Sequence, residues 1–335
     1  MSDLAHIIRG VLAGKRVAII GDIVADQYLN GTISRISREA PVFILRHDET
    51  ETRAGGAANA AVNVASLGGV PILVGAIGSD RNGEFLRASL MDSGVGDEFL
   101  VASPQLMTTT KLRVLAGRHY APRQQVIRID YEGEREIDAE TRERLLSALT
   151  LACRAADAIV FSDYNYGAAS PEMFKSALQI AANRSIPLVA DSRFRLGDFA
   201  GATSATPNQE EVEQILGREF APSDGDALRE RLRLQALLVT CGNKGMVLAE
   251  AGRPALEIPA VGSEVPVDVT GAGDTVIAAY ALGLAGGLTF LEAAKIANHA
   301  ASIAVMKKGT ASVTTEELVA SLSPSPSLIT SETAA

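Results

Sequence analysis

Residues 15–22 read KRVAIIGD, a short apolar run that stops at a glycine and a carboxylate. An apolar run of this length, bounded by turn residues, predicts a strand that is buried on both faces. The carboxylate that follows it stands where open α/β sheets place their ligand groups, outside the carboxyl end of a strand. The stretch therefore predicts the first strand of a parallel sheet and marks one edge of that sheet as the functional edge.

The same pattern is repeated along the chain. Apolar runs recur at 71–75, 158–161, 187–190 and 236–239, and segments with helical period lie at 56–67, 84–93, 139–152 and 171–182. Strands that alternate with helices predict a parallel sheet covered on both faces. Right-handed crossovers then place the carboxyl ends of the strands along one rim.

Two stretches without helices interrupt this alternation. Residues 31–48 and 108–130 contain β-type runs and predict an antiparallel patch that projects from the main sheet as a lid. Residues 116–123 (AGRHYAPR) are typical of a mobile hairpin or loop, and residues 323–335, rich in Ser, Thr, Pro and Ala, of a disordered tail. We therefore expect one domain over residues 1–322, followed by the tail.

Composition narrows the class of function. The chain has 335 residues, of which 47% are apolar and 21% charged, and its net charge of −9 argues against binding to nucleic acid or to a membrane surface. Residues 1–10 lack the apolar block of a signal peptide, and the apolar stretch 276–291 is too short to span a bilayer. Two widely separated cysteines predict neither a disulfide framework nor a zinc site. These features predict a cytoplasmic protein.

The strongest chemical signal is DVTGAGDT at residues 268–275, followed by an apolar helical run. Gly271 and Gly273 permit backbone conformations in which successive N–H groups converge on one anion, and the following helix adds its positive end. Asp274 then lies beside this anion hole, where it can take a proton from an attacking hydroxyl during phosphoryl transfer. For the motif alone, an N-capping aspartate after a Gly-rich turn is the alternative interpretation.

Two further motifs contain polar side chains near predicted helix starts. In GGAAN, Gly55 and Gly56 allow a ligand hydroxyl to approach the backbone, and Asn59 supplies a donor and an acceptor. In NQEE, which consists of Asn208, Gln209, Glu210 and Glu211, an amide and a carboxylate three residues apart can hold the water shell of Mg²⁺ beside a triphosphate. Helix capping is the alternative interpretation of both motifs.

Other residues complete the predicted mouth of the site. Thr240 and Gly242 end an apolar strand under the predicted nucleotide, and Asn298 in an Ala-rich helix is either an adenine contact or a surface amide. A set of cations lies in or near the lid and suggests a substrate that carries phosphate; its members are Lys111, Arg113, Arg118, Arg123, Arg128, Arg193 and Arg195.

With GGAAN, NQEE and DVTGAGDT in this order, the chain resembles the ribokinase-like (PfkB) carbohydrate kinases from about residue 15 to residue 314. The resemblance implies a three-layer α/β/α sandwich with a small β lid, and phosphoryl transfer from Mg-ATP to a sugar hydroxyl. It also implies residue roles: Asp274 as base; Gly271, Ala272 and Gly273 as anion hole; Asn208 to Glu211 for metal and phosphate; Thr240, Gly242 and Asn298 for the nucleotide; and Gly55, Gly56, Asn59 with Asp22 or Asp26 for the sugar. A monovalent cation (K⁺) near Asp268 is a further expectation from this resemblance.

Within that family the stretches 34–42 (SRISREAPV), 53–59, 110–114 (TKLRV) and 162–164 (SDY) look like the kinase half of heptose-phosphate kinase/adenylyltransferases. This likeness implies phosphorylation of C1 of D-glycero-β-D-manno-heptose 7-phosphate on the way to ADP-heptose for lipopolysaccharide. We expect Lys111, Arg113, Arg128 and Asp163 to contact that substrate. Two features depart from the pattern of the two-domain enzymes: the sequence Asp191-Ser192-Arg193 in place of Asp-Pro-Lys, and the 116–123 insertion. Both lie at positions where substrate selectivity can change.

Alternative functions remain at this point: a kinase for a fructose phosphate, ribose or a nucleoside, and a non-catalytic sugar-phosphate sensor. A dinucleotide-dependent dehydrogenase is disfavoured because the turn after the first strand, GDIVAD, lacks the G-x-G-x-x-G spacing. The exposed edges of a β lid favour pairing with a second lid, so we expect a homodimer.

Overall fold

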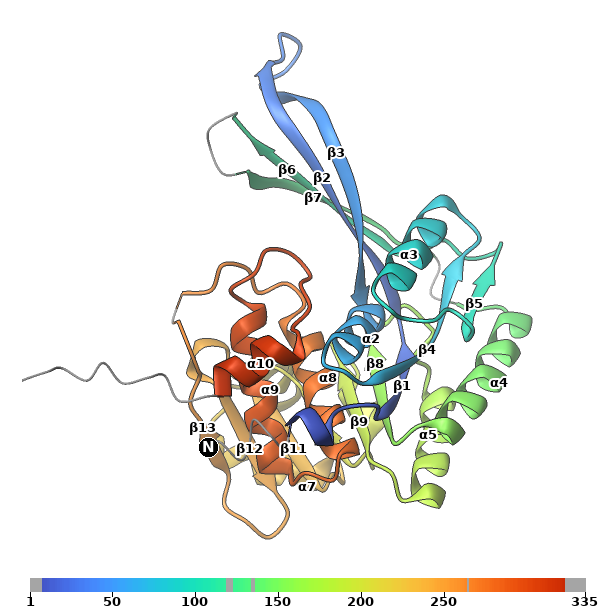
Figure 1. Cartoon of the computed structure of the whole chain (residues 1–335), viewed down its shortest axis with the longest axis vertical. Coiled ribbons are helices and arrows are strands. Elements are labelled where there is room, and N and C mark those ends of the chain that lie inside the picture. The colour runs from blue at the N-terminus through green and yellow to red at the C-terminus, as the bar shows by residue number, and fades with distance from the viewer. Residues whose placement is uncertain (1–7, 119–122, 134–135, 264, 323–335) are drawn as a thin grey trace, which may run out of the picture.

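The large sheet of the computed structural model has nine strands in the order β13-β12-β11-β10-β9-β8-β1-β4-β5 (Figure 1). The model describes residues 8–118, 123–133, 136–263 and 265–322, so the predicted tail and the centre of the 116–123 insertion lie outside the described residues. The strands are β1 (Arg16–Gly21), β4 (Val70–Gly78), β5 (Leu100–Ser103), β8 (Ala158–Asp163), β9 (Leu188–Ser192), β10 (Ser204–Ala205), β11 (Ala236–Thr240), β12 (Met246–Glu250) and β13 (Leu256–Ile258).

The centre of this sheet is parallel, as the strand and helix alternation predicts. β1 pairs in parallel with β4 on one side and with β8 on the other. The hairpin of β11, β12 and β13 is antiparallel, and the alternation of strands and helices did not predict it. Because the parallel strands run the same way, Asp22, Asp163 and Ser192 all lie at one rim.

Helices cover both faces of the sheet, and the apolar residues of β1 divide between them. Val17 and Ile19 belong to the core under α2 (Ala57–Ser66), α8 (Ala272–Ala285), α9 (Phe290–Ala304) and α10 (Thr315–Leu322). Ala18 and Ile20 belong to the opposite core, under α4 (Ala139–Ala155), α5 (Pro171–Arg184), α6 (Gln209–Leu216) and α7 (Gly225–Arg231). The three-layer α/β/α prediction is therefore confirmed.

The remaining elements are short or lie at the periphery. They are the helix α3 (Arg81–Asp92) and three 3-10 turns, η1 (Leu196–Phe199), η2 (Pro222–Asp224) and η3 (Gly242–Lys244). No helix in the described part of the chain is both long and apolar enough to cross a bilayer.

The lid is a four-stranded sheet, in the order β3-β2-β6-β7, that projects far from the main body (Figure 1). Its strands are β2 (Ile23–Ile36), β3 (Phe43–Gly56), β6 (Thr110–Gly117) and β7 (Gln124–Tyr131). Two expectations need correction. β2 and β6 pair in parallel, so the lid is a mixed sheet, and β2 and β3 together extend from residue 23 to residue 56, beyond the predicted 31–48. The missed end of β3 reads ETETR at residues 49–53, a polar stretch that hydrophobicity does not mark as a strand.

Candidate active site

Asp274 lies at the meeting point of three segments that are distant in sequence. It stands in the first turn of α8 and is only 4% exposed. The Asn59 Nδ2 of α2 donates to its Oδ2 at 2.8 Å, and the Tyr164 hydroxyl donates to its Oδ1 at 2.8 Å. The carboxylate is therefore held in one orientation from both sides, at the start of a helix.

The surroundings of Asp274 bring the pKa of its carboxyl group close to neutral pH. Burial raises the pKa of Asp274 to about 6, while the hydrogen bonds from Asn59 and Tyr164 act to lower it. Among the charges, Asp26 raises this pKa and Lys111 lowers it. A carboxylate with such a pKa is ionised at pH 7 and still basic enough to accept a proton from a hydroxyl in a transition state.

The glycine before α8 is required by the packing at this point. Gly271 is the N-cap, with φ of 79°, and a Cβ on it would lie 2.5 Å from Asn59 Nδ2. A residue with a side chain would therefore be strained in its backbone and would displace the amide that holds Asp274. The Ala272 N–H already donates to the Val269 carbonyl at 3.2 Å, so Gly271 and Gly273 remain as the candidate anion-hole donors.

The NQEE motif forms the N-terminus of α6 as a capping box. Asn208 Oδ1 accepts from the Glu211 N–H, and Glu211 Oε2 accepts from the Asn208 N–H, each at 2.9 Å. The capping interpretation is therefore correct in its geometry, and one oxygen of Glu211 remains outside the box. Burial raises the pKa of Glu211. Burial also raises the pKa of Asp191 well above its usual range, and the charges of Glu211 and Asp274 raise the pKa of Asp191 further.

Carboxylates that raise one another's pKa favour a cation between them. Asp191 stands in β9, one residue before its end, and the sequence analysis noted it without giving it a role. Its signal was its position near the end of a strand, the same signal that marked Asp22. Within the described ranges no group of three or more His, Cys, Asp or Glu side chains comes together as a complete metal site.

The predicted nucleotide residues lie beside this motif. An isolated parallel bridge joins Asn208 to Thr240 at the end of β11, so the NQEE and Thr240–Gly242 segments are neighbours. Asn298 is buried, and its Nδ2 donates to the Pro259 carbonyl at 2.7 Å. This contact attaches α9 to the chain that follows β13. The amide donor predicted to contact adenine is therefore engaged by the protein.

On the sugar side, the lid strands place their charges next to the base. Asp26 on β2 forms an ion pair of 2.5 Å with Arg113 on β6, and burial raises the pKa of Asp26. Gly55 on β3 allows this arrangement, because a Cβ there would lie 2.6 Å from Asp26 Oδ2. Gly56 caps α2, which begins with the residues that lead to Asn59. The predicted sugar motif and the base are therefore in one place.

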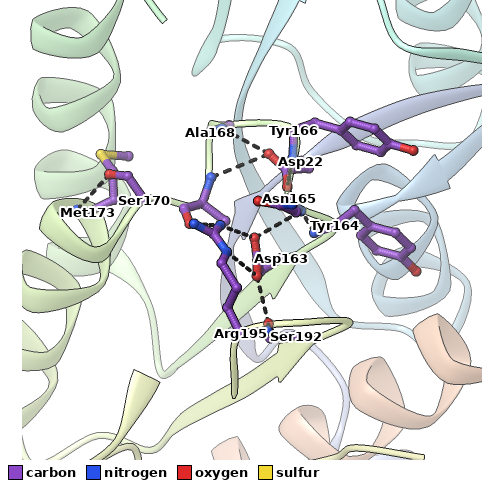
Figure 2. A network of polar contacts seen from close by, with 11 residues as sticks. Asp22, Asp163, Tyr164, Asn165, Tyr166, Ala168, Ser170, Met173, Ser192 and Arg195 are labelled. Atoms are coloured by element: carbon purple, nitrogen blue, oxygen red, sulfur yellow. Dashed lines mark hydrogen bonds and ion pairs between the residues drawn. The ribbon is translucent and has the colours of Figure 1, made fainter. Parts of the chain in front are cut away.

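Asp22 and Asp163 have a role other than the predicted sugar contact (Figure 2). Asp22 Oδ2 accepts the N–H groups of Tyr164 at 2.8 Å and Tyr166 at 2.9 Å, and its Oδ1 accepts that of Ala168 at 2.8 Å. Asp163 accepts from Arg195 at 2.5 Å and from the Ser192 hydroxyl at 2.6 Å. Both carboxylates are buried and accept hydrogen bonds from the protein, and their contact with the substrate stays a prediction. They hold the loop that carries Tyr164.

Tyr164 is the residue at the site for which sequence reasoning gave no role. The tyrosine is half-buried, and burial together with Asp274 raises its pKa well above its usual value, so it stays a hydrogen-bond donor. Its signal in sequence was only its place directly after a strand-end aspartate. Nothing in that local pattern indicates that its hydroxyl reaches a residue 110 positions away.

Comparisons with known proteins agree with this geometry. The profile of the pfkB family of carbohydrate kinases matches residues 15–317. The bifunctional protein HldE of Nitrosococcus oceani is 42% identical over 316 residues, which cover 92% of this chain and 64% of the relative. HldE of Pseudomonas paraeruginosa is 42% identical over 309 residues, with 90% and 62% covered. The chain thus spans slightly less than two thirds of the length of these relatives.

Solved structures show the same fold at lower identity. Ribokinase of Arabidopsis thaliana, complexed with ribose and ATP, superposes with a TM-score of 0.69 at 20% identity and covers 93% of this chain and 100% of its own. Phosphofructokinase-2 of Escherichia coli in complex with fructose-6-phosphate has a TM-score of 0.68 at 17% identity, covering 91% and 97%. The family profile matches most of the sequence, and the chain therefore belongs to the pfkB family of carbohydrate kinases, phosphotransferases that act on a sugar hydroxyl.

Proposed function

We propose that the protein transfers the γ-phosphoryl group of ATP to the C1 hydroxyl of D-glycero-β-D-manno-heptose 7-phosphate, with Asp274 as the general base. The observation that carries the proposal is the buried Asp274 with its pKa of about 6 at the start of α8. The choice of sugar is supported by the likeness to HldE at 42% identity and by the resemblance of residues 34–42 and 110–114 to its kinase half.

In the proposed reaction each residue near Asp274 has one task. Asp274 accepts the proton of the C1 hydroxyl while that oxygen forms its bond to phosphorus and the bond to the leaving ADP oxygen breaks. The Gly271 and Gly273 N–H groups and the start of α8 stabilise the charge on the transferred group. Asn59 and Tyr164 keep the carboxylate in the orientation in which it faces the hydroxyl.

The metal that accompanies ATP has suitable oxygen donors at the other side of the site. The free oxygen of Glu211, the Asn208 side chain and Asp191 form the kind of hard, anionic donor set that Mg²⁺ takes, directly or through water. Mg²⁺ neutralises triphosphate charge there. A monovalent cation such as K⁺ near Asp268 is part of the proposal, supported by the structure of E. coli phosphofructokinase-2 in complex with potassium.

The outer face of the lid supports a homodimer. The side chains of Ile127 and Ile129 on β7 are 53% and 39% exposed, and their strand partners are Val114 and Leu112 on β6. Since residues two apart share a face of a strand, these four form an apolar patch on the side opposite Lys111 and Arg113. We propose that two lids pair through this patch, in a protein that works in the cytoplasm.

A substrate panel tests the function. Purified protein is given Mg-ATP with heptose 7-phosphate, fructose 6-phosphate, ribose or a nucleoside, and the product carbon is mapped by ³¹P and ¹³C NMR. We expect turnover on heptose 7-phosphate with the new phosphate at C1. Turnover on ribose but not on heptose 7-phosphate would overturn the choice of sugar, and no turnover with any sugar would favour a non-catalytic sensor.

The base is tested by Asp274→Asn. The substitution removes the proton acceptor, so we expect kcat to fall by about 10²–10⁴-fold. ATP binding, measured by calorimetry, is expected to stay within a few-fold of wild type because Asp274 faces the hydroxyl and not the nucleotide. Near-wild-type turnover would remove Asp274 as the base.

A further inference from the structure

The cations predicted around the mouth of the site divide into two groups. Most are neutralised by a carboxylate of the protein: Arg113 by Asp26 at 2.5 Å, Arg123 by Asp48 at 2.8 Å, Arg128 by Asp130 at 2.9 Å, and Arg195 by Asp163 at 2.5 Å. Lys111, Arg118 and Arg193 differ, because in the part of the chain that the structure describes none of the three forms an ion pair with a carboxylate. Arg118 and Arg193 are exposed, whereas Lys111 is buried. The charges of Lys111 and Arg193 are not isolated, because Asp26 and Asp130 act on Lys111 through space and Arg193 acts in the same way on Asp191 and Glu211.

Both of these cations lie against the ring of Tyr164. Lys111 Nζ is 5.4 Å from the centroid of this ring, and Arg193 Cζ is 5.7 Å from it. Lys111 comes from the lid strand β6 and Arg193 from the turn after β9, so the ring joins the lid to the rim of the main sheet. Figure 2 shows the Tyr164 side chain standing out from the loop that Asp22 holds. Its hydroxyl ends on Asp274.

The position of Lys111 is costly without a ligand. Lys111 is only 8% exposed. Burial lowers the pKa of its ammonium group most, and the charge of Arg193 lowers it further. Asp26 and Asp130 act to raise this pKa, and Arg128 to lower it. A buried ammonium placed near a guanidinium, with no bonded carboxylate, destabilises the empty fold. An anion that binds between the two cations would remove that cost.

We propose that Lys111 and Arg193, supported by the ring of Tyr164, form a cradle for one phosphate dianion beside Asp274. The inference rests on the proposed kinase function and adds a subsite to it. Two phosphate groups fit this chemistry: the phosphoryl group in transfer, and the phosphate that the sugar already carries. Both carry anionic, non-bridging oxygens that accept charge-assisted hydrogen bonds from ammonium and guanidinium groups.

The first test needs no sugar. The melting temperature of the whole chain is measured in sodium phosphate and in sodium chloride at equal ionic strength, for wild type, Lys111→Met, Arg193→Met and the control Arg46→Met. Arg46 is a lid cation with an exposed side chain, paired only at 3.7 Å with Asp48. We expect phosphate to raise the melting temperature of wild type and control, and the effect to be lost in the two cradle variants.

The melting temperature of the Lys111→Met protein without phosphate provides a second test. Because the substitution removes a buried charge that forms no ion pair with a carboxylate, the melting temperature of this variant in chloride is expected to equal or exceed that of wild type. A residue with a merely structural role would lower it. If phosphate stabilises both cradle variants as much as wild type, the cradle is refuted, whatever sugar the enzyme accepts.

Steady-state kinetics with the accepted sugar distinguish the two phosphate groups. If the cradle holds the substrate's own phosphate, the variants raise KM for the sugar phosphate by about tenfold or more and leave KM for ATP unchanged. If it holds the phosphoryl group in transfer, kcat falls by about tenfold or more while both KM values stay within about twofold. Unchanged kcat and KM values would overturn the cradle. Absence of turnover with every sugar would count against the proposed function, whereas the melting comparison would still decide the phosphate site.

Discussion

Replacing Tyr164 by Phe removes one hydroxyl and keeps the ring on which Lys111 and Arg193 lie. That hydroxyl donates to Asp274 Oδ1 at 2.8 Å, and this bond lowers the pKa of the carboxyl, which burial raises to about 6. Without the donor, the buried carboxylate is less well stabilised in its charged form, so its pKa must rise further. The proposed base must be ionised, so kcat/KM rises with pH through this pKa and levels off above it.

The size of the shift follows from the hydrogen bond. A hydrogen bond to a charged group contributes about 1.5–3 kcal/mol. Since one pH unit corresponds to about 1.4 kcal/mol, the acidic limb of the profile should move up by about 1–2 pH units. For Tyr164→Phe we therefore expect a midpoint near pH 7–8 in place of about pH 6, a loss of about 5- to 50-fold at pH 6, and recovery toward wild type at pH 9.

The assay is a coupled measurement of ADP release between pH 5 and 9 at constant ionic strength. Tyr166→Phe is the matched control, because the Tyr166 hydroxyl donates to Glu132 at 2.8 Å and has no contact with Asp274. Its acidic limb is expected to coincide with that of wild type. An acidic limb that stays at the wild-type pH in Tyr164→Phe would refute the assignment of this limb to Asp274. A shift in both variants would refute the specific role of the Tyr164 hydrogen bond.

Three further predictions concern other parts of the site. Gly271→Ala is expected to destabilise the fold by about 1–2 kcal/mol because of its left-handed backbone alone, with a further loss from the 2.5 Å approach of the new Cβ to Asn59. Gly273→Ala, whose Cβ would meet nothing within 4 Å, should change the unfolding free energy by less than about 0.5 kcal/mol. Equal chemical denaturation curves for the two variants would contradict this. Glu211→Gln keeps an oxygen that can close the capping box but loses its charge. The Mg²⁺ concentration for half-maximal activity should therefore rise several-fold, while the melting temperature stays unchanged. An unchanged Mg²⁺ requirement would exclude Glu211 from the metal site. Ile127→Glu places a charge in the apolar lid patch and should convert the proposed dimer to a monomer in light scattering; a wild-type monomer would refute the lid interface.

The pattern of the sequence predicted five of the nine strands of the main sheet, namely β1, β4, β8, β9 and β11, and the layers of helices on both faces. The predicted run 15–22 contains β1, and the predicted segments 139–152 and 171–182 correspond to α4 and α5, whose ends differ from the prediction by a few residues. Apolar runs and helical periods report burial directly, so they predict layers well. The extent of β3 was underestimated because residues 46–53 are mostly polar or charged, and such residues conceal a strand from any criterion based on hydrophobicity.

Residue roles were predicted less evenly. Asp274 was predicted as the base from a glycine-rich turn before an apolar helix together with the other motifs of the family, and the structure places it in the first turn of α8. Asp22 and Asp163 were predicted as substrate contacts from the family resemblance, and both lie at the rim where the parallel strands end. Whether a rim carboxylate faces a ligand or a backbone loop depends on where the neighbouring loop runs. Here the Tyr164–Ala169 loop takes up the hydrogen bonds of Asp22.

The sequence by itself was sufficient for the layered sheet and the family, because the signals for both lie in residues close together along the chain. Only the tertiary structure decided which charges remain unpaired. Arg113 and Lys111 are two residues apart on one strand, yet Arg113 is neutralised by Asp26 and Lys111 is left beside Tyr164. The pairing of a charge depends on distances between distant segments, and Coulomb energy falls with distance in space, not in sequence.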